Sequence, residues 1–178
     1  MTSRSHTVAD SPYGPLTLVA TDGVLCGLYM TEQRHRPPQE SFGEVDARPF
    51  GDVIDQLDEY FAGERTEFDL PLRLHGTPFQ RGVWEQLLKI PYGETRSYGQ
   101  LAGALGKSGA SRAVGLANGK NPVGIIVPCH RVIGSTGGLT GYGGGLDRKR
   151  RLLVFEGATG TSGAAPAGTK AGAAGTLF

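Results

Sequence analysis

The residues best suited to chemistry form a short run, Pro128-Cys129-His130-Arg131-Val132, at the end of an apolar segment. A free thiol has a pKa of about 8.5 and is only a few per cent ionised at neutral pH, so a nucleophilic cysteine needs help from its neighbours. His130 offers a base and Arg131 a fixed positive charge. A lone cysteine is more often a small buried apolar residue. The residues beside Cys129 instead favour a reactive thiol, with His130 acting directly or through a bridging water.

The elements that would position this thiol are helices in the second half of the chain. Apolar residues recur at helical spacing over 79–88, and a last helix is predicted over 147–156. Ser97 and Gln100 have the spacing of a capping box, which predicts the start of a short helix. A turn containing glycine and a second helix, over 111–119, follow it. This arrangement fits a helix-turn-helix, although helical hairpins of this size are common in unrelated folds.

The first half of the chain is predicted to form a small sheet with a helix. Turn residues separate three short apolar runs, over 5–9, 15–20 and 24–30, which predicts an antiparallel meander. Pro49 opens a helical pattern that Gly63 ends. Two further segments complete this half, a predicted loop over 31–48 and a predicted strand of alternating apolar residues over 68–74.

The composition excludes several classes of protein. The 178 residues are 38% apolar and 20% charged, as in globular proteins. No apolar run approaches the roughly 18 residues of a membrane span, and the N-terminus lacks the apolar stretch of a signal peptide, so a cytoplasmic protein without membrane contact is expected. Cys26 and Cys129 are too few for a disulfide framework, and no cysteine or histidine pair has zinc-finger spacing, so no metal site is predicted. Residues 157–178, mostly Ala, Gly and Thr, are predicted to be a disordered tail.

The net charge of +1 hides a division of charge along the chain. Residues 1–78 carry six basic and thirteen acidic side chains, whereas residues 79–156 carry eleven basic and four acidic ones. Such a bias suggests an anionic partner for the basic half. A solvated basic face without a ligand is an equal alternative from charge alone.

Taken together, these residues resemble the O6-alkylguanine-DNA alkyltransferases, also called methylated-DNA–protein-cysteine methyltransferases. The resemblance covers about residues 5–156 and is carried by five motifs, Pro128-Cys129-His130-Arg131-Val132, Ile90-Pro91-Tyr92-Gly93-Glu94-Thr95-Arg96-Ser97-Tyr98, Ser111-Arg112-Ala113-Val114-Gly115, Asn121-Pro122, and Gly141-Tyr142 with Leu152, Leu153 and Glu156. It implies an α/β (α+β) fold. An N-terminal ribonuclease-H-like sheet domain over 1–75 would precede a C-terminal helical, winged-helix-like domain over 76–156, which holds the helix-turn-helix and the acceptor.

The resemblance also implies a role for each motif residue. Cys129 would be the nucleophile and permanent alkyl acceptor, and His130, hydrogen-bonded to Glu156, would draw off its proton through a water. Asn121 would brace the loop before the acceptor. Tyr98 would help to turn out the nucleotide and donate its hydroxyl to guanine N3. The implied DNA contacts are Arg112, which would fill the space left by the base, with Tyr98, Ser97, Ala113 and Arg131. The implied guanine pocket consists of Val127, Tyr142 and Gly143.

The implied function is DNA repair by direct, irreversible transfer of the alkyl group from O6-alkylguanine to Cys129, once per molecule and without a cofactor. O4-alkylthymine is left open as a minor substrate. The implied partner is double-stranded DNA containing alkylated guanine, bound through the minor groove with the damaged nucleotide flipped out. A monomer is expected, with cooperative assembly on DNA left open.

Three other functions compete with this interpretation. An alkyltransferase-like protein would recognise damage without transferring anything, and such relatives carry another residue, commonly tryptophan, at the position of Cys129. A transcription regulator that uses only the helix-turn-helix would bind DNA with sequence preference and consume no thiol. A cysteine hydrolase would turn over.

Overall fold

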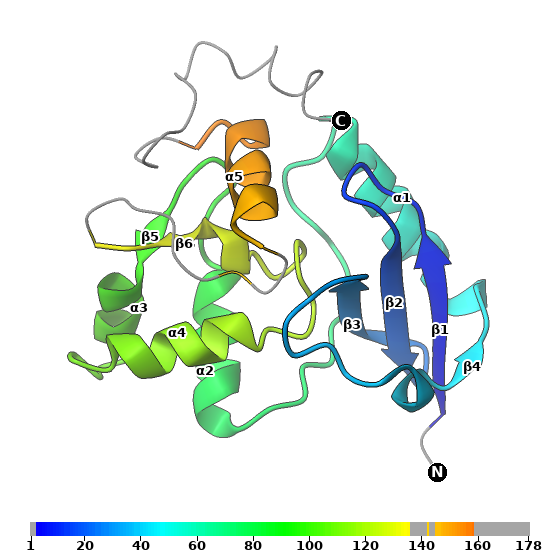
Figure 1. The fold of residues 1–178 in the computed structure, drawn as a ribbon, viewed down its shortest axis with the longest axis horizontal. Helices are drawn as coiled ribbons and strands as arrows, with labels where there is room; N and C mark the ends of the chain where they lie inside the picture. The colour runs from blue at the N-terminus through cyan, green and yellow to red at the C-terminus, as the bar shows by residue number, and fades with distance from the viewer. Residues whose placement is uncertain (1–2, 136–141, 143–144, 159–178) are drawn as a thin grey trace. The chain divides into compact units, whose positions relative to one another are not determined.

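The computed structural model describes residues 3–135, 142 and 145–158. The chain forms two compact units (Figure 1). The first comprises residues up to 75 together with 122–126, and the second comprises residues 76–121 and those from 127 onward. A single division after residue 75 was predicted from the sequence, and it misses the return of the chain to the first unit over 122–126.

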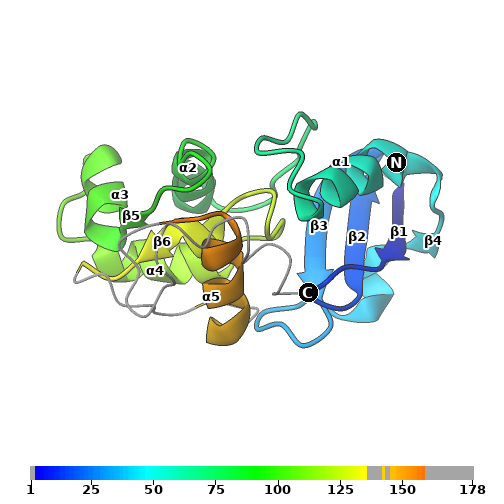
Figure 2. The same ribbon diagram turned by 90° about the horizontal axis from the view of Figure 1, so that it is seen from above.

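A four-stranded sheet forms the first unit, in the order β3-β2-β1-β4. Strands β1 (Arg4–Ala9), β2 (Leu16–Thr21) and β3 (Val24–Met30) pair antiparallel in succession. The predicted meander is therefore confirmed. Helix α1 (Gly51–Phe61), also predicted, lies along one face of the sheet (Figures 1 and 2). It buries Val53, Leu57 and Tyr60 at helical spacing.

Two segments of this unit differ from the sequence-based prediction. The predicted loop over 31–48 contains the short edge strand β4 (Glu44–Val45), parallel to β1, and the 3-10 turn Gln39–Phe42, and a second such turn, Arg48–Phe50, begins at its last residue. The predicted strand over 68–74 is wrong. Only Leu72 makes an isolated bridge, to Leu25 of β3, and the proline at position 71 has no N–H to offer to a ladder.

The second unit is mainly helical. Its helices are α2 (Pro78–Leu87), α3 (Tyr98–Ala104), α4 (Ser111–Gly119) and α5 (Leu146–Phe155). Capping boxes begin α2 and α3: Ser97 and Gln100 satisfy each other's backbone N–H groups, as their spacing predicts. Trp84 is a core residue, and its Nε1 donates to the Ala117 carbonyl of α4 at 2.9 Å.

Two short parallel strands, β5 (Arg96–Ser97) and β6 (Val132–Ile133), lie side by side in this unit (Figure 1). They join the residues just before α3 to the last residue of the acceptor motif and the residue that follows it. Strands of two residues are too short to leave a period-2 pattern, which explains why the sequence does not reveal them.

The structure that caps the end of helix α5 extends two residues into the predicted tail. Gly157 has a φ of 71°, and the N–H groups of Gly157 and Ala158 donate to the carbonyls of Val154 and Leu153. This is a Schellman motif, for which the positive φ of a glycine is well suited. Ala158 is buried against Leu153 and Ile133. The prediction that the tail begins at Gly157 is therefore wrong, and its remaining residues lie outside the described part of the chain. Among the described residues, none of the helices has the length and hydropathy needed to traverse a bilayer.

Candidate active site

The backbone around Cys129 is bent by local turns. The Cys129 N–H donates to the Val127 carbonyl at 2.8 Å, which closes a tight turn around Pro128 at φ −82° and ψ 65°. Residues Cys129–Arg131 then form one turn of 3-10 helix. Because such a helix has three residues per turn, the side chains of Cys129, His130 and Arg131 point in three different directions. The sulfur and the imidazole are thus neighbours in sequence that face different surroundings.

His130 is held by a carboxylate that is distant in sequence. Its Nε2 lies 2.9 Å from Oε2 of Glu156, and both side chains are fully buried. A carboxylate only accepts hydrogen bonds, so Nε2 carries the proton. In the neutral ring Nδ1 then keeps its lone pair, and this buried atom has no hydrogen-bond partner among the described residues. Burial lowers the pKa of His130 although Glu156 opposes this, so the resting ring is an uncharged base.

Arg131 lies inside the unit and holds the same carboxylate. Its Nε donates to Oε1 of Glu156 at 2.8 Å and its Nη2 to Oε2 at 3.0 Å. A third bond runs from Nη1 to the Ile90 carbonyl, and the guanidinium lies 5.8 Å from the ring centre of Tyr92. Arg131 is only 6% exposed. The structure therefore corrects the prediction that Arg131 contacts DNA, because its guanidinium is buried and paired with Glu156.

The thiol of Cys129 is protonated at rest. Burial raises its pKa, while a hydrogen bond with Asn121 and the charge of Lys149 work in the opposite direction. Cys129 is 7% exposed. A thiolate at this position must therefore be made by removing a proton, and the groups that stabilise it are already in place.

Two asparagines brace the backbone next to the thiol. Asn121 Nδ2 donates to the Val127 carbonyl at 2.7 Å, which agrees with the expected bracing of the loop. Asn118, at the end of α4, donates to the Cys129 carbonyl at 3.3 Å and was missed by sequence reasoning. The Val127 oxygen also accepts from the Cys129 N–H. Its two acceptor positions are occupied, so the structure does not leave it free to recognise a base.

Lys149 is the other residue that the sequence analysis missed. It is fully buried in α5, and burial lowers its pKa to about 8 although the nearby Cys129 opposes this. Its Nζ also lies 6.0 Å from the ring centre of Tyr98. The signal was present, since Lys149 precedes Leu152, Leu153 and Glu156 by three, four and seven residues and so shares their buried face. This periodicity is easily overlooked because Lys149 lies in a run of four basic residues, which usually face solvent.

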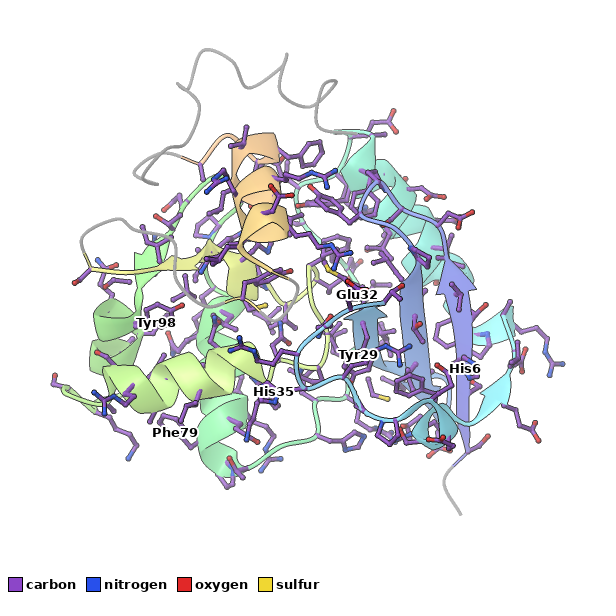
Figure 3. All side chains as sticks on the ribbon, viewed as in Figure 1. His6, Tyr29, Glu32, His35, Phe79 and Tyr98 are labelled. Atoms are coloured by element: carbon purple, nitrogen blue, oxygen red, sulfur yellow. The ribbon has the colours of Figure 1, made fainter. Side chains whose placement is uncertain are left out.

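The predicted DNA-contacting residues divide into two groups. Arg112 and Ala113 are exposed at the start of α4, with Leu116 one turn further at 65% exposure. Ser97 and Tyr98 are half-buried at the start of α3. Tyr98 lies between α3 and α4 (Figure 3), where a side chain on Gly115 would touch its ring. Tyr98 therefore connects the exposed helix pair to Lys149. Tyr142 is half-buried, and Gly143 lies outside the described residues.

No three His, Cys, Asp or Glu side chains gather to hold a metal ion in the portion of the chain that the structure describes. The site combines a protonated thiol, an adjacent neutral imidazole, a buried carboxylate and two buried cations. Such a set can remove a proton from sulfur and stabilise the anion that results.

Comparison with known proteins agrees with this geometry. Two family models match the chain, the ribonuclease-like domain of 6-O-methylguanine DNA methyltransferase over residues 5–74 and its DNA binding domain over residues 78–158. The methylated-DNA–protein-cysteine methyltransferase of Mycobacterium tuberculosis is 59% identical over 147 residues, which are 83% of this chain and 88% of that protein. The protein of the same name from Methanosarcina acetivorans is 47% identical over 153 residues, 85% of this chain and 97% of that protein. The crystal structure of Mycobacterium tuberculosis OGT in complex with DNA superposes with a TM-score of 0.80 at 57% identity, covering 85% of this chain and 92% of that one.

Proposed function

The chain belongs to the 6-O-methylguanine DNA methyltransferase family, so it is a DNA-repair methyltransferase, and we propose that Cys129 is the residue that receives the alkyl group. One observation carries this assignment. The residue after Cys129 is a buried, neutral histidine whose Nε2 is fixed on Glu156 at 2.9 Å, which leaves Nδ1 as a base. Asn121 and Lys149 favour the thiolate from the other side.

The reaction follows from these groups. The Cys129 proton passes to Nδ1 of His130 through a bridging water, and Glu156 stabilises the imidazolium that forms. The sulfur attacks the O6-linked carbon in line, so the S–C bond forms while the C–O6 bond breaks. The electron pair of that bond remains on the guanine, and the balance closes when the proton reaches the released base. The product is a thioether, which water does not hydrolyse, so each molecule reacts once.

Tyr98 is the group that we assign to the leaving guanine. Its hydroxyl would donate to N3, where negative charge develops as the bond to O6 breaks. The Lys149 cation 6.0 Å from the centre of its ring makes this phenol a stronger donor. Removal of a group that acts only on developing charge should lower the rate of transfer more than the affinity for the base.

Double-stranded DNA is the substrate that we propose, bound through the minor groove by a monomer. The O6 atom of a stacked guanine is out of reach of a buried sulfur, so the nucleotide must leave the stack at a cost of a few kcal/mol. Arg112 is exposed at the start of α4 and is the side chain that would replace the lost stacking. O6-alkylguanine is the main substrate in this proposal and O4-alkylthymine a minor one.

The competing functions lack this support. A damage-binding protein that transfers nothing has no use for a cysteine whose neighbours are arranged to deprotonate it. A regulator that uses only α3 and α4 has no use for it either. A cysteine hydrolase would form a thioester that water cleaves and would therefore turn over, whereas the thioether proposed here would end the reaction after one transfer.

Mass spectrometry of the intact protein after incubation with a duplex carrying O6-methylguanine tests the proposal. We expect the gain of one methyl group, located on the peptide that contains Cys129, and no gain in Cys129→Ser. Cys26→Ser is the matched control, because Cys26 is equally buried but its sulfur lies 3.2 Å from the Thr21 hydroxyl, at hydrogen-bond distance, in the first unit. This variant should be methylated to the same extent as the wild-type protein. Unmethylated protein that demonstrably binds the damaged duplex would instead identify a damage-binding module.

A further inference from the structure

Arg131 makes three hydrogen bonds inside the unit, two of them to the carboxylate that holds His130. It holds both oxygens of Glu156, at 2.8 and 3.0 Å, and fixes its own position with a third bond to the Ile90 carbonyl. The third bond anchors it to the loop that precedes β5, whereas Glu156 follows α5. Three segments distant in sequence thus meet at one guanidinium, whose planar fork suits bidentate binding of a carboxylate.

We propose that Arg131 is a positioning residue for alkyl transfer, which neutralises and orients Glu156 so that His130 remains uncharged and able to take the thiol proton. This inference rests on the proposed function, because it concerns the base assigned to Cys129. Arg131 would touch neither the alkyl group nor the guanine.

Charge balance in the buried site determines the protonation of His130. With Arg131 present, Glu156 already has a compensating cation, and burial together with repulsion from Arg131 and Lys149 outweighs the attraction of Glu156 for a charged ring. Without Arg131, a buried carboxylate would be left with the imidazole as its closest partner. The pair would then bind a proton in the resting protein, and His130 would be an imidazolium before substrate arrives. An imidazolium cannot accept a proton from sulfur.

The other charged and titratable groups near His130 either disfavour a charged ring, as Arg131 does, or are uncharged in the resting protein. Lys149, on α5, also disfavours a charged ring, as Arg131 does. Tyr92, on the loop before β5, has a raised pKa because of burial and the charge of Glu156, so it is neutral. Cys129 is neutral at rest. Arg131 and His130 both bind Glu156 directly.

The test compares Arg131→Met with Arg131→Lys. The rate at which free O6-benzylguanine alkylates Cys129 is measured against pH, since a free base needs no DNA contact. In Arg131→Met the acidic limb of the profile should move to higher pH by at least about one unit, which is a loss of about tenfold or more in rate on that limb. Arg131→Lys keeps the charge and should keep the limb within a few tenths of a unit of the wild type. Arg96→Met removes a half-exposed arginine of the same unit and serves as the control.

Two results would overturn the inference: an unmoved acidic limb in Arg131→Met, or an equal shift in Arg131→Lys. Nitrogen NMR of His130 in the wild-type protein provides a measurement that does not depend on a folded variant. The ring should show a protonated Nε2 and a bare Nδ1 from pH 6 to 8, and an imidazolium in that range would contradict the proposal. If the wild type transferred no alkyl group at all, the proposed function would fail, while the protonation of His130 in the wild type compared with Arg131→Met would still decide the role of Arg131.

Discussion

Lys149 is a buried cation, and burial of its charge destabilises the fold. The same residue favours the reaction. Burial lowers its pKa from 10.5 to about 8, so the folded protein binds this proton less tightly than the unfolded chain does. Stability that depends on Lys149 should therefore be lowest below pH 8 and should recover as the pH rises toward 10.5. The same charge favours the thiolate of Cys129.

Lys149→Met should separate these two effects. Because the variant removes a buried cation and keeps most of the apolar volume, we expect a gain of about 1–2 kcal/mol in the free energy of unfolding at pH 7. The gain should shrink above pH 8 and vanish near pH 10.5. Alkylation of Cys129 should slow by about tenfold or more, since the thiolate loses a stabilising charge. Urea titrations at several pH values and the alkylation rate measure the two effects, and a variant that is both less stable and equally fast would contradict this account.

Helices and strands differ in how clearly the sequence predicts them. The meander, α1 and the pair α3 and α4 follow from apolar spacing, turn residues and the Ser97–Gln100 capping box, all of which act within a few residues. Strand β4 was missed because it is two residues long and depends on pairing with distant β1. Gly157 was assigned to the tail because the tail is rich in glycine, although the positive φ of Gly157 belongs to the motif that ends α5.

The candidate site shows the same division between local and distant information. Cys129 and His130 stand out because their residue types and neighbours suggest chemistry, whereas the role of Asn121 was implied by the family resemblance. The role of Arg131 could not be predicted from the motif that contains it, since its partner Glu156 lies 25 residues away and the anchoring carbonyl of Ile90 lies 41 residues away. Whether a cation points outward to a phosphate or inward to a carboxylate depends on tertiary packing.

Helix α4 presents the side chain that should assist extrusion of the nucleotide, so its effect should depend on the duplex. Arg112→Ala is expected to slow repair of O6-methylguanine in duplex DNA by about tenfold, because unstacking is no longer offset, while the reaction with free O6-benzylguanine stays within twofold. Lys120→Ala is the matched control, since Lys120 is also an exposed cation but follows the opposite end of α4. Comparable slowing on both substrates would mean that Arg112 does not act in extrusion.

On the scale of the whole chain, the separation of charge along the sequence bears on the strength of DNA binding. Residues 79–156 contain eleven basic side chains, but Arg131 and Lys149 are buried, so at most nine of them can face phosphates. The acidic residues fall mainly in the first 78, where thirteen occur. Binding to undamaged duplex should therefore be driven by release of counterions from phosphates contacted by the second unit, with little dependence on base sequence.

The salt dependence of binding reports how many cations of the second unit contact phosphates. If about four to six of those nine cations contact phosphates, the logarithm of the affinity for undamaged duplex should fall with the logarithm of salt concentration with a slope of about −4 to −5. Arg112→Ala and Lys107→Ala, both exposed, should each reduce the steepness by about one, whereas Arg131→Lys should leave it unchanged because that charge lies inside the unit. Fluorescence anisotropy between about 50 and 300 mM salt measures the slope. A nearly flat dependence, or strong preference among undamaged sequences, would show that the basic half reads DNA mainly through its bases and would revive the transcription-regulator interpretation.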